Sequence, residues 1–202
     1  MRGFQVGAAH FVERHGLLVL VAIGESVVAV GIGAGEQPLG PRLAAVAVLG
    51  LLLSACLWWV YFAQGDDERA EAAMTAATDE RRARLAIEAF GYWHLALLLG
   101  VVMAAAGLKQ AVAHPFTPER AAFAVLLAAG VALFLAAHLG FRRTLGTGSG
   151  TGRALAAALA LATIPLGLWV SAALQLGVLV AAIAATVALE QAAARRGDAE
   201  AR

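Results

Sequence analysis

Runs of apolar residues long enough to cross a lipid bilayer constrain this chain more than any other feature. A helix that crosses the hydrocarbon core needs about 20 predominantly apolar residues. Four such runs lie at about residues 16–34, 43–63, 89–108 and 121–141. With 61% hydrophobic residues and a mean hydropathy of +0.77, the chain is also more apolar than an ordinary soluble domain. The sequence therefore predicts an all-α integral membrane protein, a bundle of transmembrane helices.

The longest uncharged stretch, residues 154–189, predicts two short spans rather than one. At about 1.5 Å per residue, its 36 residues are too long for one crossing and just long enough for two. Pro165 and Gly167 favour a reversal of the chain within residues 165–172. The prediction is a single domain of six transmembrane helices over residues 1–192, with the last two spans at about 154–170 and 172–190 and a cytoplasmic tail at 193–202.

The positions of Lys and Arg predict the side of the membrane that each loop faces. Cytoplasmic loops carry an excess of these cations. With six spans, twelve of the fifteen fall on the side that carries both termini, whereas five spans would divide them nine to six. Six spans with both termini in the cytoplasm is therefore the prediction. The twelve are Arg2, Arg14, Arg69, Arg81, Arg82, Arg84, Arg142, Arg143, Arg153, Arg195, Arg196 and Arg202, and the other three are Arg42, Lys109 and Arg120.

Two loops on the cytoplasmic side differ in composition. Residues 64–86 are rich in Asp, Glu and Arg, which favours either a surface amphipathic helix or a flexible linker. The segment FRRTLGTGSGTGR, residues 141–153, is rich in glycine but lacks the GxxxxGK[ST] pattern of a phosphate-binding loop and any preceding buried strand. We interpret this second segment as a flexible linker.

Glu25 lies near the middle of the first span, in HFVERHGLLVLVAIGESVVAVGIG. A charge at that depth is costly, and an ionisable residue in a span usually faces the bundle interior and marks a functional path. We interpret Glu25 as a site that handles a proton or a cation. The structural alternative is a residue that is hydrogen-bonded to another helix and never changes protonation. Gly24 beside it allows helices to approach closely.

Charged residues before Glu25 extend a polar stripe toward the cytoplasm. Arg14 precedes Glu25 by eleven residues, which places both within roughly 20° of one helix face. About 16 Å separates them along the helix axis, too far for a direct ion pair. His10 extends the stripe by one more turn. We expect Glu13 and Arg14 to act as gate charges at the cytoplasmic entrance.

The third span begins with IEAFGYWH and brings two further titratable groups. Glu88 is expected near its cytoplasmic end, with His94 about 9 Å deeper, where its charge can change near neutral pH. We expect that Glu25, Glu88 and His94 could converge, with His94 as a partner of Glu25. The alternative is a buried histidine satisfied by a neighbouring hydroxyl or backbone group. His138, near the cytoplasmic end of the fourth span, is expected at the interface.

Aromatic residues mark the end of the second span, in CLWWVYFA. Amphipathic aromatic side chains favour the membrane–water interface. We therefore interpret Trp58, Trp59, Tyr61 and Phe62 as an interfacial belt, with stacking on a substrate as the alternative.

The sequence lacks the motifs that are typical of several kinds of site. The single cysteine, Cys56, cannot form an intramolecular disulfide. No HExxH, CxxC, nucleophile or dinucleotide-binding motif is present, so we expect no metal, no cofactor and no enzymatic activity. A membrane enzyme would need a water-filled cavity that converges on Glu25 and His94. The cations fall in short segments between apolar runs, so the lipid bilayer and not nucleic acid is the expected partner.

Three segments in the same order resemble the bacterial low temperature requirement protein A family: HFVERHGLLVLVAIGESVVAVG, WWVYF and YWHLALLLGVVMAAAGLKQAVAHP. Typical members are roughly twice as long, and this chain resembles their C-terminal half. Members tend to carry an acid directly after WWxYF, where this chain has Ala63, with Asp66 and Asp67 displaced along the loop. The matching positions are His10, Glu13, Arg14, Gly24, Glu25, Ser26, Trp58, Trp59, Tyr61, Phe62, His94, Gly107, Lys109, His114 and Pro115.

The resemblance implies a multi-pass protein of the bacterial cytoplasmic membrane, in a family named for a cold-growth phenotype and without a settled substrate. Combined with the residues above, it leads to the hypothesis that the bundle moves or senses a proton or a small solute, with Glu25 as the central site. The alternative is a non-transporting scaffold or stress-adaptation protein. We expect a homodimer, or association with a missing N-terminal half, to complete the assembly.

Overall fold

The computed structural model describes residues 7–35, 37–63, 65–147 and 151–200, and all of its regular structure there is helical. Within these residues, six helices or helix pairs are long and apolar enough to cross a membrane, which confirms the predicted six-helix all-α bundle. The crossing elements are α1 (Ala8–Ala34), α2 (Pro41–Phe62), the π-helix η1 (Ala86–Trp93) continued by α5 (His94–Ala113), α6 (Ala121–Leu145), α7 (Thr151–Ala162) followed by α8 (Ile164–Trp169), and α9 (Ala172–Glu200).

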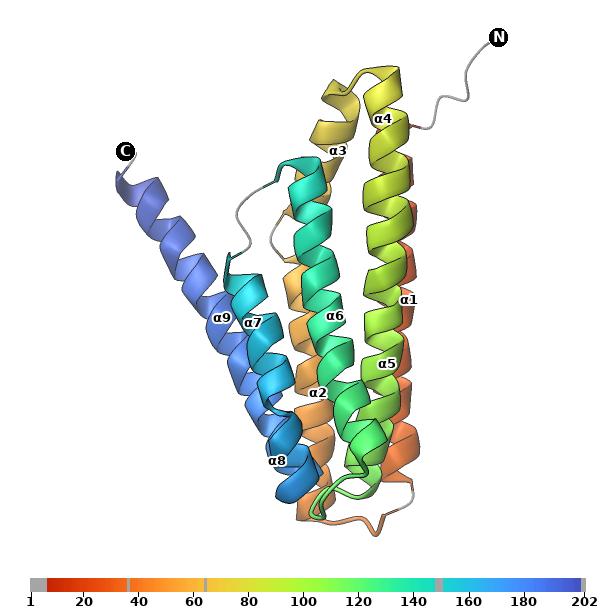
Figure 1. The fold of residues 1–202 in the computed structure, drawn as a ribbon, viewed down its shortest axis with the longest axis vertical. Helices are drawn as coiled ribbons and strands as arrows, with labels where there is room; N and C mark the ends of the chain where they lie inside the picture. The colour runs from red at the N-terminus through yellow and green to blue at the C-terminus, as the bar shows by residue number, and fades with distance from the viewer. Residues whose placement is uncertain (1–6, 36, 64, 148–150, 201–202) are drawn as a thin grey trace.

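The first crossing helix begins and the last one ends at the same end of the bundle (Figure 1). We call this the termini end and the opposite one the far end. An even number of crossings requires this arrangement, and the distribution of Lys and Arg predicts that the termini end faces the cytoplasm. The helix α9 continues to Glu200, so helix occupies most of the predicted tail, and residues 201–202 lie outside the described residues.

The acidic segment after α2 forms two short helices at the termini end, α3 (Asp66–Ala76) and α4 (Asp79–Leu85). Of the two alternatives for residues 64–86, the helical one is therefore correct. Gly65 has a φ of 66°, a left-handed conformation that favours glycine and turns the chain from α2 into α3. The helix α3 contacts α1, α2 and α6. Residues 148–150 of the predicted glycine-rich linker lie outside the described residues.

The centre of the bundle is filled by α5 and α6, which approach each other more closely than side chains on both helices would allow. A Cβ atom added to Gly107 would lie 2.5 Å from the backbone nitrogen of Leu127, and one added to Gly130 would collide with the backbone of Ala104. Side chains such as those of Val101 and Phe134 are fully buried beside these contacts. Dispersion contacts between closely spaced backbones stabilise helix pairs in lipid, where the hydrophobic effect between helices is absent.

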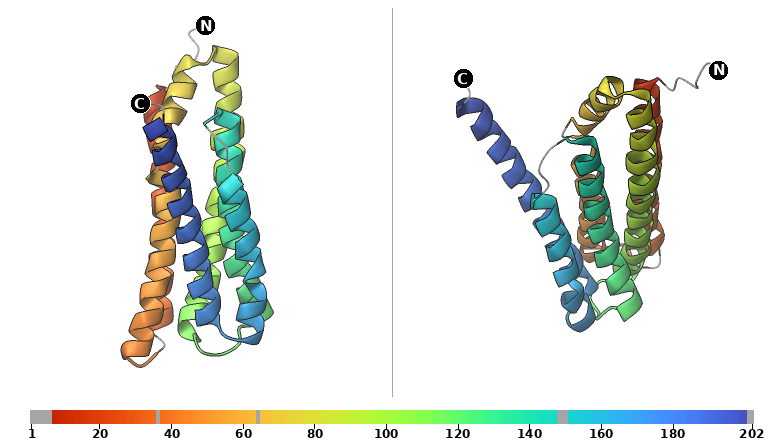
Figure 2. Two further views of the ribbon diagram at one scale, coloured as in Figure 1. Left: turned by 90° about the vertical axis from the view of Figure 1, so that its left-hand side faces the viewer. Right: turned by 45° about the horizontal axis from the view of Figure 1, so that its top comes forward.

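The last two crossings form a hairpin, α7–α8 followed by α9, on one side of this centre. The chain reverses at Val170 and Ser171, inside the predicted range. At the far end, the Gln175 amide donates to the carbonyl oxygen of Ala124 at 2.9 Å and ties α9 to α6. Toward the termini end, α9 diverges from the other helices (Figures 1 and 2). The hairpin is therefore packed most closely at the far end.

Candidate functional site

A hydrogen-bonded pair of side chains lies inside the bundle toward its termini end. The Tyr61 hydroxyl oxygen and the His94 Nε2 atom are 2.8 Å apart, and both residues are buried. The His94 Nδ1 atom is 3.2 Å from the carbonyl oxygen of Ala89. Because a carbonyl oxygen only accepts, Nδ1 of the neutral ring carries the proton and Nε2 accepts from the Tyr61 hydroxyl. The pair is thus internally satisfied, which matches the alternative expected for a buried His94.

The backbone positions His94 through a π-helical segment. The π-helix η1 directly precedes His94, whose ring contacts the carbonyl of Ala89, five residues earlier. Such segments are rare and are often found at functional sites. The aromatic rings of Phe90, Phe141 and His15 surround the imidazole, with centroid distances of 5.2, 4.9 and 5.3 Å. His94 therefore lies in an aromatic cage with one hydroxyl partner.

A second polar cluster surrounds Asp66, at the first residue of α3. Although Asp66 follows a hydrophilic turn, it is only 1% exposed. Its Oδ2 atom lies 3.3 Å from His138 Nε2, 3.5 Å from Arg142 Nη1 and 3.8 Å from Arg153 Nη2. Its Oδ1 atom accepts a 3.1 Å hydrogen bond from Arg69. One carboxylate therefore lies among three arginines and a histidine drawn from α3, α6 and α7.

The geometry around His138 fixes the protonation pattern of this cluster. The Arg153 Nε atom is 3.1 Å from His138 Nδ1, and a guanidinium can only donate. Nδ1 must therefore be the unprotonated, accepting nitrogen, which leaves Nε2–H to face the Asp66 carboxylate. Arg153 also pairs with Glu190 on α9, with 3.2 Å between Nη1 and Oε2. The prediction that His138 is interfacial is wrong, because its side chain is fully buried between these partners.

The residues predicted to carry function lie mostly on the outside. Glu13, Arg14, Glu25 and Glu88 are exposed, whereas His94 is buried. Within the described residues, neither Arg14 nor Glu25 has an ion pair or hydrogen-bonding side-chain partner. The structure therefore does not join Glu25, Glu88 and His94. The acid that completes a charge network after WWVYF is Asp66, and its partners do not include Arg14.

The other positions singled out in the sequence divide between the surface and the interior. Of the aromatic residues, Trp58 and Trp59 are exposed, Phe62 is half-buried, and Tyr61 points inward to His94, so the belt interpretation is wrong for Tyr61. Ser26 is buried, and its hydroxyl donates to the carbonyl of Ile23 at 2.6 Å. His10, Gly24, Lys109 and His114 are exposed, whereas Gly107 and Pro115 are buried.

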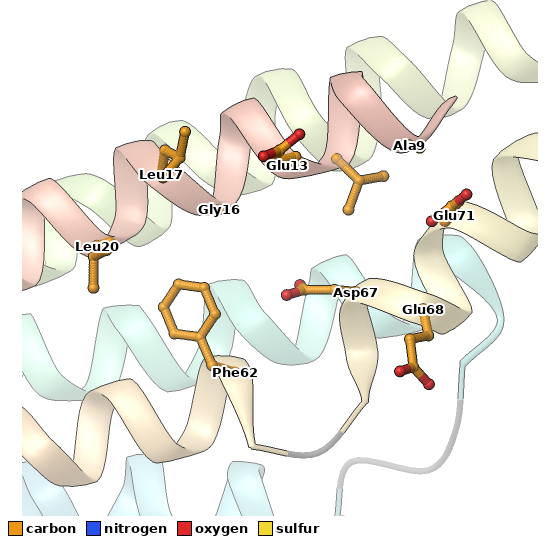
Figure 3. Close-up of a pocket in the computed structure, with 10 residues that line it drawn as sticks. Ala9, Glu13, Gly16, Leu17, Leu20, Phe62, Asp67, Glu68 and Glu71 are labelled. Atoms are coloured by element: carbon orange, nitrogen blue, oxygen red, sulfur yellow. The ribbon is translucent and has the colours of Figure 1, made fainter. Parts of the chain in front are cut away.

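A surface pocket of about 280 Å³ opens between α1 and α3 at the termini end. Figure 3 shows Phe62 and Asp67 reaching from α2 and the start of α3 toward α1. Apolar groups form most of its wall, and Glu13, Glu68 and Glu71 also line it. These carboxylates give the pocket a preference for cations over anions. Among the described residues, no group of three or more His, Cys, Asp or Glu side chains is placed to hold a metal ion.

Sequence comparisons show which known proteins this chain resembles. The family model described as bacterial low temperature requirement A protein (LtrA) matches residues 1–189. The chain is also 27% identical over 138 residues to a protein of Rhizobium meliloti (strain 1021) named uncharacterized protein RA0937. That alignment covers 68% of this chain and 33% of the relative, so the chain spans about a third of the length of the curated relative it matches. No solved structure gives a significant match.

Proposed function

The chain belongs to the bacterial low temperature requirement A family, and we propose that it moves or senses a proton or a small cation in the bacterial cytoplasmic membrane. The observation that carries the proposal is the position of Glu25. It is exposed midway along α1, a helix long and apolar enough to cross the membrane. A carboxyl group at such a depth is costly against lipid, so it requires a polar partner, water or a bound cation outside the described helices.

The exposed face of α1 has features of a surface that contacts another helix rather than lipid. Its exposed positions recur about every seven residues, as on any helix with one outward face, and this face combines Glu25 with two glycines that let a second helix approach closely. Gly24 and Gly31 lie on this face, and a Cβ atom at either would meet nothing within 4 Å. By contrast, Gly33, Gly107 and Gly130 lie where two helices approach closely. The repeating exposed positions are Leu17, Gly24 and Gly31, then Leu18, Glu25 and Ile32, then Val21 and Val28.

A second copy of the chain is the partner we propose for this face. Two copies inserted in the same orientation would hold their Glu25 residues at equal depth. The two carboxyl groups would then share one interface shielded from lipid, where a proton or small cation can bind between them. His94 and Tyr61 would form a separate buried pair within each copy.

Proton flux into vesicles containing the purified protein tests the proposal. Glu25→Gln keeps the hydrogen-bonding shape of the side chain but cannot titrate, so it should abolish a pH-driven flux while leaving helix content unchanged. Glu80→Gln removes an exposed acid on α4 and serves as the control, with flux equal to that of the unmodified protein. Full flux in Glu25→Gln would contradict the proposal.

A membrane scaffold is the second candidate function, and the mutual pairing of the buried polar residues favours it. Tyr61 satisfies His94, while Asp66 lies between His138 and the arginines, as expected of groups that fix helix packing. In a scaffold, Glu25→Gln should leave vesicle flux at the level of protein-free vesicles, as in the unmodified protein. Only a change such as Glu25→Leu, which removes all hydrogen bonding, should then disturb the assembly.

A further inference from the structure

We infer that Asp66 is the centre of a latch that holds the termini end of the bundle closed. The latch consists of Asp66 on α3, His138 and Arg142 on α6, Arg153 on α7 and Glu190 on α9. It goes beyond the proposed function, because it concerns movement of the helices and not the species that binds at Glu25. Four elements that are separated in sequence meet in it through paired side chains.

Arg153 is the link between the hairpin and the rest of the bundle. From α7 its guanidinium lies 3.8 Å from Asp66, 3.1 Å from His138 and 3.2 Å from Glu190, and the residue is only 2% exposed. Gly152 leaves the space for this link, because a Cβ atom there would lie 2.6 Å from the Glu190 Oε1 atom. The hairpin is thus tied to α3 and α6 by charge at the end where α9 diverges (Figure 2).

The two ends of the hairpin are held by different forces. At the far end, Gly167 lies against Gln175 and Ala124, and the Glu119 amide donates to the Gly167 carbonyl at 2.8 Å. Water cannot replace these far-end contacts unless the helices separate and expose their backbone. At the termini end, ion pairs and hydrogen bonds connect charged groups that water can solvate once they separate. The hairpin can therefore pivot about its far end when the latch breaks.

Loss of the Asp66 charge should break the latch. Without it, the buried guanidinium groups of Arg142 and Arg153 lose the carboxylate that lies between them, so keeping them buried costs more. Movement of α3 and α7 would then expose His138 and the adjoining Tyr61, whose rings are 5.6 Å apart, to water. The same contacts that shield the buried polar residues thus control access to them.

Distance measurements between spin labels in the full-length protein test this inference. With Cys56 replaced by serine, labels at Ala72→Cys and Leu189→Cys report the separation of α3 from α9 at the termini end. Labels at Leu39→Cys and Trp169→Cys report the far end; all four positions are exposed.

Asp66→Asn should shift the termini-end distances to longer values and broaden their distribution, with the far-end distances unchanged. Glu71→Gln, an exposed change on the same helix, should leave both pairs unchanged. Identical termini-end distributions in Asp66→Asn and the unmodified protein would overturn the inference. If Asp66→Asn also disturbs the far end, Glu190→Gln decides, because it cuts only the outer link to Arg153: broadening at the termini end supports the latch, and no change overturns it.

Discussion

Two acidic residues, Glu25 and Asp66, occupy opposite environments from those that their sequence positions predict. Glu25 lies in an apolar span and was expected to face the bundle interior, yet it is exposed on the outer face of α1. Asp66 lies in a hydrophilic loop and is almost fully buried among cations. Depth along the membrane and burial within the bundle are thus separate quantities. An acid can be deep and outward-facing, or shallow and enclosed.

The difference suggests a division of roles between the two carboxyl groups. Asp66 is surrounded by cations of its own chain, so its charge is already used to hold helices together. Glu25 has no such partner among the described residues and is available to a ligand or to another chain. We therefore propose that Asp66 holds helices together and that Glu25 handles the solute.

The largest expected effect is on the free energy of unfolding when Asp66 loses its charge. Removing one partner of a buried ion pair costs about 3–5 kcal/mol, because the charges that stay buried lose an interaction that offsets their desolvation. Asp66→Asn should lower the unfolding free energy by this amount, whereas Glu25→Gln should change it by less than about 0.5 kcal/mol. Denaturant titration in mild detergent, followed by circular dichroism, measures both. Equal losses of unfolding free energy in the two variants would contradict the different roles proposed for the two acids.

A smaller effect separates the glycines of the interior from those of the outer face. Gly130→Ala places a methyl group against the backbone of Ala104 and should destabilise the bundle by about 1–3 kcal/mol. Gly24→Ala meets open space and should stabilise the isolated chain by up to about 1 kcal/mol through its higher helix propensity. The same titration compares the two. A marked loss in Gly24→Ala would show that α1 packs against its own bundle on this face.

The smallest effect concerns Glu119, a half-buried acid at the far end that has no ion pair among the described residues. Burial raises its pKa to about 7, from an ordinary value near 4.5. The folded protein therefore binds more protons than the unfolded chain between these values, so stability falls as pH rises from about 4.5 to about 7. Glu119→Gln should flatten this part of the dependence of the thermal midpoint on pH. An unchanged slope in the variant would assign it to other groups.

Hydropathy and the distribution of cations were sufficient to predict the helical architecture. Each apolar run became a crossing helix, and the uncharged stretch from 154 to 189 reversed at Val170 and Ser171, because the prediction depends on length and on local breakers. The paired glycines of α5 and α6 could be recognised as packing residues only in general terms. Which glycine contacts which backbone depends on how each helix is rotated about its axis. That rotation cannot be read from one sequence alone.

The same reasoning predicts only part of the candidate site. His94 was singled out as a deep titratable residue and is buried, with a hydroxyl partner on another helix. The sequence does not reveal Asp66 as a centre, since its partners on α6 and α7 come 72 or more residues later in the chain and pairing across that separation leaves no local pattern. The one available signal was the spacing of His138 and Arg142, four residues apart on one face of α6.

Disulfide cross-linking in the membrane tests most directly whether the outer face of α1 is an interface. With Cys56 replaced by serine, Val28→Cys on α1 and Val48→Cys on α2 provide a matched pair: both valines are 53% exposed, and each lies six or seven residues from the far end of its helix. Mild oxidation should join two copies through Val28→Cys and leave Val48→Cys monomeric. Equal cross-linking of both variants, or none through Val28→Cys, would contradict the assignment of Glu25 to an interface between two copies.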